Sequence, residues 1–225
     1  MGRTLGTMPS LLPIRQPDLP ARDWFGTAHG RLVLACEQPL LARAGDERPG
    51  LPWVCISPAE RPVEAEDRHL LWLRVDGIDA LAGDVGCAVD RWPLASESVG
   101  TVVLQHAGDC GLAREDALVE ANRVLVPGGR LWLFSLNPLS PYRRYWWRQG
   151  VSDAEPFTWR RHLRRHGFEP EAVAEGIGPA WNAQRISAVQ IGAGARAAYR
   201  LCAEKRSLPL TIKRARVPSP ALTPA

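Results

Sequence analysis

Short apolar runs alternate with polar, helix-like segments along most of this chain. Their aliphatic, β-branched and aromatic content predicts β-strands in four places, residues 51–57 (LPWVCIS), 70–75 (LLWLRV), 99–105 (VGTVVLQ) and 130–136 (RLWLFSL). Weaker runs predict further strands at 85–89, 168–174 and 197–204. Apolar strands separated by polar helical segments are typical of an α/β protein with a parallel sheet.

Helical periodicity is clearest between these strands. Residues 24–44 predict either one helix, which Pro39 would kink, or a shorter element with a strand at 32–36. Residues 113–125 predict a helix that ends in the chain reversal 127–129 (PGG). A last helix is expected from Thr158, as its N-cap, to Gly167.

The connections in the first half of the predicted sheet are short. A crossover between parallel strands needs about a dozen residues. Residues 58–69 just meet that length, and residues 76–84 do not. We therefore expect either truncated helices in this half or strands that are not all parallel.

Composition indicates one globular domain of ordinary hydrophobicity. The 225 residues are 45% hydrophobic and 23% charged, and no apolar run approaches the ~18 residues of a membrane span. The proline-containing start has no apolar core of a secretory signal. We expect a disordered lead-in at 1–22, a domain at 23–212 and a basic, proline-rich tail at 213–225, with no membrane partner.

Cysteines and charge narrow the function classes further. The five cysteines are scattered and form no CxxC motif, which argues against a disulfide framework or a metal site and favours the cytoplasm. Net charge is +4, but all basic residues except Lys205 and Lys213 are arginine. This bias accounts for the arginine-rich segments, so a nucleic-acid partner is not expected.

The middle of the chain carries a family resemblance. Residues 90–106 (DRWPLASESVGTVVLQH) and 118–138 (LVEANRVLVPGGRLWLFSLNP) resemble the C-terminal half of class I S-adenosylmethionine-dependent methyltransferases, closest to a small bacterial type 11-like branch. The resemblance extends over roughly 24–214. It implies a Rossmann-like, mostly parallel sheet with shortened N-terminal crossovers and a C-terminal antiparallel strand pair.

The resemblance also implies S-adenosylmethionine as cofactor. The turn after the first strand, at Cys55, Ile56 and Ser57, would face the methionine moiety, but this turn has no glycine and Pro58 lacks a backbone donor. Asp76 ends the second strand, where a carboxylate binds the ribose hydroxyls.

The adenine-binding position falls on the third predicted strand. The residue there is Ala88, with Asp84 and Asp90 as nearby carboxylates. Each lost charge-assisted hydrogen bond would weaken cofactor binding by about 1.5–3 kcal/mol.

Three residues beyond the cofactor motifs are candidates for chemistry. His106, at the end of the fourth strand, is a general base, a substrate contact or a polar strand terminus. Asn137, after the fifth strand, either holds the substrate or makes a turn. Tyr142 lies in an aromatic, basic segment (YRRYWWR) that either stacks on the substrate or packs as a lid.

Two functions therefore remain. The first is a methyltransferase acting on an unknown small-molecule acceptor. The second is a methyltransferase-fold scaffold or interaction protein that has lost cofactor binding. The sequence does not indicate the oligomeric state.

Overall fold

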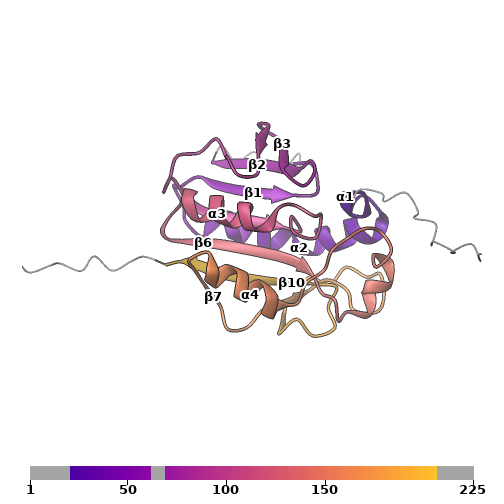
Figure 1. Cartoon of the computed structure of the whole chain (residues 1–225). Coiled ribbons are helices and arrows are strands. Elements are labelled where there is room, and N and C mark those ends of the chain that lie inside the picture. Colours follow the sequence, from indigo (N-terminus) through magenta and orange to yellow (C-terminus); the bar gives the residue numbers. More distant parts are fainter. Residues whose placement is uncertain (1–20, 62–68, 207–225) are drawn as a thin grey trace, which may run out of the picture.

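A ten-stranded mixed sheet forms the centre of the molecule (Figure 1). The computed structural model describes residues 21–61 and 69–206, so the predicted lead-in and basic tail lie almost wholly outside the described residues. The sheet order is β4-β3-β2-β1-β5-β6-β10-β8-β9, with β7 paired to β10. The strands are β1 (Trp53–Ser57), β2 (Leu70–Val75), β3 (Ala80–Gly83), β4 (Cys87–Ala88), β5 (Val99–Gln105), β6 (Leu125–Leu136), β7 (Phe168–Pro170), β8 (Glu175–Ile177), β9 (Gln190–Ile191) and β10 (Ala198–Lys205).

The four long strands predicted from the sequence form the parallel core. β1 pairs in parallel with β2 on one side and β5 on the other, and β5 pairs in parallel with β6. Every residue of β1 and β5 is buried, as expected of strands covered on both faces. The chain order reverses between β1 and β5, and the carboxyl ends of strands at such a point form the usual ligand crevice of an open α/β sheet.

The prediction of a third strand at residues 85–89 was largely wrong, because only the two-residue strand β4 lies there. After β2 the chain turns back at once, and β2, β3 and β4 are antiparallel neighbours. The segment is too short for a crossover helix, so a meander replaces it. Gly77 lies in this turn and has a φ of +129°. Gly83 ends β3 before the next turn: its φ is +136°, and a Cβ there would lie 2.5 Å from the Trp72 carbonyl oxygen.

Helices cover both faces of the sheet. Figure 1 shows α3 (Arg114–Val124) on one face and α2 (Ala28–Asp46) on the other. Of the two interpretations of residues 24–44 the helical one was right, but the helix is not continuous: α2 begins at Ala28 and contains Pro39. A short helix, α1 (Ala21–Phe25), precedes α2. Leu40 of α2 and Leu118 of α3 are buried in separate apolar clusters, as expected for opposite layers.

Two turn assignments need correction. Thr158 is not an N-cap, because α4 (Pro156–Arg165) begins earlier, at a proline, after Glu155. Proline suits the first helical turn because it has no N–H to satisfy. The predicted reversal at 127–129 lies inside β6, where Gly128 has a φ of +71° and the β5–β6 register shifts between Val99 and Thr101.

The C-terminal side of the sheet is antiparallel, as predicted. β10 lies between β6 and the short strands β7 and β8, and is antiparallel to all three. In the described parts of the chain, we find no helix with the length and apolar character needed to cross a bilayer.

Candidate functional site

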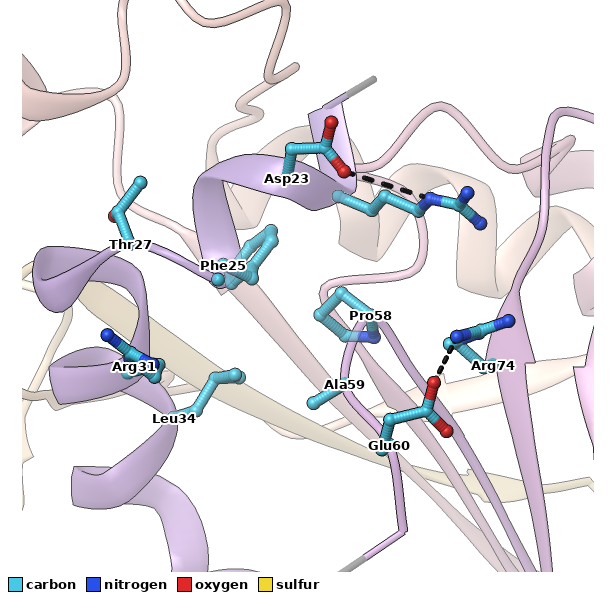
Figure 2. Close-up of a pocket in the computed structure, with 11 residues that line it drawn as sticks. Asp23, Phe25, Thr27, Arg31, Leu34, Pro58, Ala59, Glu60 and Arg74 are labelled. Atoms are coloured by element: carbon cyan, nitrogen blue, oxygen red, sulfur yellow. Dashed lines mark hydrogen bonds and ion pairs between the residues drawn. The ribbon is translucent and has the colours of Figure 1, made fainter. Parts of the chain in front are cut away.

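A pocket of about 670 Å³ opens where β1 and β2 end, against α1 and the first turn of α2 (Figure 2). Its volume is typical of small-molecule sites. The lining residues are Arg22, Asp23, Phe25, Gly26, Thr27, Arg31, Leu34, Pro58, Ala59, Glu60 and Arg74. The pocket therefore lies at the carboxyl edge of the parallel strands, where this kind of sheet binds ligands.

The corner between α1 and α2 gives the pocket a well-defined wall. Thr27 is the N-cap of α2: its hydroxyl oxygen accepts from the Gly30 amide at 3.2 Å and donates to the Trp24 carbonyl at 2.7 Å. Gly30 lets the two helices meet, because a Cβ there would lie 2.3 Å from the Trp24 carbonyl oxygen. Phe25 is buried at this corner and faces the pocket.

Ion pairs neutralise much of the charge around the pocket. Arg22 of α1 donates to the Asp76 carboxylate at 2.5 Å, and Arg74 pairs with Glu60. The Nε atom of Arg74 is buried and has no hydrogen-bond partner in the part of the chain that the structure describes. No interaction partner of the exposed Arg31 guanidinium is found among the described residues.

A buried polar network lies behind the pocket, across the ends of the central strands. It begins at the Ala59 amide, which donates to the Ser57 hydroxyl oxygen at 3.1 Å. The Ser57 hydroxyl donates to Gln105 Oε1 at 2.8 Å, and Gln105 Nε2 donates to Glu37 Oε2 at 2.7 Å. This network connects a pocket-lining residue of the turn after β1 to α2 on one face of the sheet.

His106 lies between two carboxylates at the centre of this network. Its Nε2 is 2.9 Å from Glu37 Oε1, its Nδ1 is 2.7 Å from Asp109 Oδ2, and all three side chains are fully buried. Burial opposes a charge on His106, but the two carboxylates outweigh burial and raise its pKa to about 9. The ring is therefore an imidazolium at neutral pH.

The backbone around His106 is shaped to hold this arrangement. His106 has a φ of +50°, a left-handed conformation that is uncommon outside glycine. Asp109 also accepts from the Ser135 hydroxyl and the Leu136 amide, both at 2.7 Å, which joins the loop after β5 to β6. The Phe25 ring lies 4.7 Å from the imidazole, so the charged centre contacts the pocket wall.

None of the nine residues predicted as site residues lines this pocket, but three are next to it. Ser57 precedes the Pro58–Ala59 lining and bonds to Ala59. Asp76 pairs with the lining residue Arg22, and His106 contacts the lining residue Phe25. Their predicted roles stay predictions.

The other predicted cofactor residues lie elsewhere. Cys55 and Ile56 are fully buried, and their side chains belong to different apolar clusters. Burial raises the pKa of the Cys55 thiol. Ala88 and Asp90 are exposed at the β4 edge of the sheet.

The two predicted substrate residues are buried, and Asn137 joins two distant segments of the chain. The Asn137 amide nitrogen donates to the carbonyls of Gly194 at 2.9 Å and Arg196 at 3.0 Å, which ties the end of β6 to the segment before β10. Tyr142 is the second residue of the 3₁₀ helix η1 (Pro141–Tyr145) and is buried. Burial raises the pKa of its hydroxyl to about 12.

Glu37 and the arginines of the pocket were not predicted from the sequence. Glu37 has a detectable signal: it falls three residues after Leu34 and four before Leu41, on the apolar face of the predicted helix. A carboxylate on a buried face requires a partner, because an unpaired buried charge is costly. Nothing in the local sequence distinguishes Arg22, Arg31 and Arg74 from the many other arginines.

No family model and no curated protein matches this chain, whereas solved structures do. An S-adenosylmethionine-dependent methyltransferase of Thermotoga maritima aligns with a TM-score of 0.56 at 20% identity, over 82% of this chain and 93% of that one. A methyltransferase of Archaeoglobus fulgidus gives 0.54 at 15% identity, over 82% and 97%. Geranyl diphosphate C-methyltransferase of Streptomyces coelicolor, in complex with S-adenosyl-L-homocysteine, gives 0.50 at 15%, over 79% of each chain. The chain thus has the Rossmann-like fold of class I methyltransferases.

Proposed function

We propose that this protein is an S-adenosylmethionine-dependent methyltransferase that acts on a small molecule. The observation that carries the proposal is the position of the pocket: it opens at the carboxyl ends of β1 and β2, with the Asp76 carboxylate directly after β2. In this fold, that edge is where a nucleotide-like ligand binds. The sequence motifs at 92–98 and 123–129 support the finer assignment to the type 11-like branch.

The residues around the pocket fit this cofactor in two respects. Asp76 supplies a carboxylate for the ribose hydroxyls, at the strand end where the fold requires it. Its ion pair with Arg22 does not prevent this, because both side chains are more than a third exposed and such pairs contribute about 0–1 kcal/mol. A hydrogen bond from a hydroxyl to a carboxylate contributes about 1.5–3 kcal/mol and would displace the arginine.

The charge of the buried network is the second feature that fits this cofactor. Two carboxylates, Glu37 and Asp109, surround one imidazolium, His106, so the cluster carries a net negative charge behind Phe25. A negative interior favours a cationic ligand on the other side of the Phe25 ring. Bound S-adenosylmethionine would supply an activated methyl group on a sulfonium cation.

The turn after β1 is the part of the pocket that fits the cofactor least well. The Ala59 amide already donates to the Ser57 hydroxyl oxygen, and Pro58 has no amide hydrogen. Two backbone donors near the methionine moiety are therefore missing. This observation favours the second candidate function, a methyltransferase-fold interaction protein that no longer binds the cofactor. We rank it second because the pocket has kept its place and a ligand-sized volume.

In the first proposal, His106 is a positioning residue. Both ring nitrogens contact carboxylates and the side chain is fully buried, so no nitrogen is left for a substrate. His106 instead fixes the loop after β5 beneath Phe25. The cytoplasm remains our expected location, and all five cysteines are free.

Titration calorimetry with S-adenosylmethionine and S-adenosylhomocysteine tests the proposal. We expect heat of binding at or below millimolar ligand, and an Asp76→Ala variant should bind about tenfold more weakly. Asp79→Ala is the matched control, because Asp79 is exposed on the same turn but, unlike Asp76, forms no ion pair with a pocket-lining residue among the described residues. Absence of heat with the full chain would reject the methyltransferase and leave the interaction protein.

A further inference from the structure

The charged residues of the pocket are distributed unevenly. Figure 2 shows Arg31 and Arg74 on opposite sides of it, with Pro58 and Ala59 between them. Arg74 has Glu60 as its partner, and Arg22 has Asp76. Among the described residues, the Arg31 side therefore has positive charge with no acidic side chain to balance it.

The local structure around Arg31 increases this positive potential. Arg31 is in the first turn and a half of α2, a helix of nineteen residues whose first turn contains no acidic residue. A helix N-terminus carries a partial positive charge, and acidic residues commonly compensate it. Here the N-cap Thr27 and Arg31 both line the pocket, so a helix end without acidic residues and a cation with no partner among the described residues lie in the same place.

From this juxtaposition we propose that the pocket contains an anion subsite at Arg31, and that the methyl acceptor is a small molecule with a carboxylate or phosphate group. Naming the ligand an acceptor rests on the proposed function. The cofactor itself would lie between Asp76 and the turn after β1, on the side of the pocket away from Arg31. An anionic acceptor at Arg31 would then approach the cofactor from α2.

Guanidinium chemistry suits such a ligand. Arginine donates two parallel hydrogen bonds to a carboxylate or phosphate, which fixes the direction of the ligand as well as its affinity. Leu34, one turn further along α2, is buried at the same wall and offers an apolar contact to the rest of the acceptor. The subsite thus combines one charged and one apolar contact.

Calorimetry with inorganic phosphate as the probe, at constant ionic strength, tests the subsite. Wild-type protein should bind phosphate, and Arg31→Gln should weaken that affinity about tenfold. Arg43→Gln is the matched control, because it removes the same charge from an exposed position of α2 outside the pocket. No binding by wild type, or equal weakening in both variants, would overturn the proposal.

A second experiment separates an acceptor subsite from one for the carboxylate of the cofactor. Phosphate affinity should be unchanged when the protein is first saturated with S-adenosylhomocysteine, and Arg31→Gln should bind S-adenosylhomocysteine as wild type does. Competition between the two ligands, or a tenfold loss of S-adenosylhomocysteine affinity in Arg31→Gln, would overturn the acceptor assignment. If wild type binds phosphate through Arg31 but no cofactor, the anion subsite stands and the methyltransferase proposal fails.

Discussion

The guanidinium of Arg22 donates to the carboxylate of Asp76 across 54 positions of the sequence, at 2.5 Å. This contact joins α1 to the end of β2 and places an arginine beside the residue expected to bind the ribose. It is a partly exposed pair, so it competes weakly with a ligand.

The first prediction concerns this competition. Arg22→Gln should free Asp76 and increase affinity for S-adenosylmethionine by up to about fivefold, since the pair contributes at most about 1 kcal/mol. Titration calorimetry on the two proteins measures the change. Weaker binding in the variant would mean that Arg22 contacts the cofactor itself.

Removal of His106 should destabilise the whole domain. In His106→Asn, the buried carboxylates of Glu37 and Asp109 lose their shared cation, and breaking a buried ion pair costs about 3–5 kcal/mol. Urea denaturation measures the free energy of unfolding. His162→Asn is the control, because its ion pair with the exposed Glu115 should contribute no more than about 1 kcal/mol.

A smaller change keeps this test informative if His106→Asn does not fold. Glu37→Gln retains the shape of the side chain and leaves one carboxylate on the imidazolium. If the network stabilises the fold, the Glu37→Gln variant should also have a lower free energy of unfolding than wild type. Stability equal to wild type would contradict the account of the network.

Stability should also depend on pH through the same residue. The folded-state pKa of His106 is about 9 and its ordinary value is 6.5, so folding favours the protonated ring. The stabilisation is fully present below about pH 6.5 and is lost as pH rises through 9, by about 3 kcal/mol in total. Urea denaturation between pH 6 and 9.5 measures it, and Glu37→Gln should flatten the curve.

Gly30 should tolerate no side chain. A methyl group at Gly30 would meet the backbone of Trp24 and Phe25 at 2.3 and 2.5 Å, so α1 would have to move off α2. We expect Gly30→Ala to lose about 3 kcal/mol of unfolding free energy and to weaken ligand binding in the pocket. Gly86→Ala, which meets nothing within 4 Å, is the control and should behave as wild type in both measurements.

The sequence predicted those parts of the fold in which one local pattern determines the structure. Residues 99–105 form β5 as expected, because this apolar run of 7 residues is short for a helix and rich in β-branched valine and threonine, which together favour a buried strand. Its neighbours β1 and β6, and β2 beyond β1, were found for the same reason. The segment 76–89 was harder, since its length excluded a crossover helix but did not specify the hairpin that replaced it.

The site was less predictable because its contacts join distant segments. His106 and Asn137 were recognised as unusual residues, but their partners Glu37 and Gly194 come from elsewhere in the chain. Only the fold shows that His106 is enclosed by carboxylates. The pocket cations were missed because a composition rich in arginine gives no individual arginine a distinctive signal.

The pairing of β10 with β6 has a consequence for biosynthesis. β10 pairs with β6 from Ala198 to Glu204, yet it is synthesised some sixty residues later. Until the ribosome has released it, the apolar edge of β6 lacks its partner, and unpaired apolar edges are prone to join other chains. Truncation before Ala198 is therefore expected to produce aggregates, whichever ligand the other end of the sheet binds.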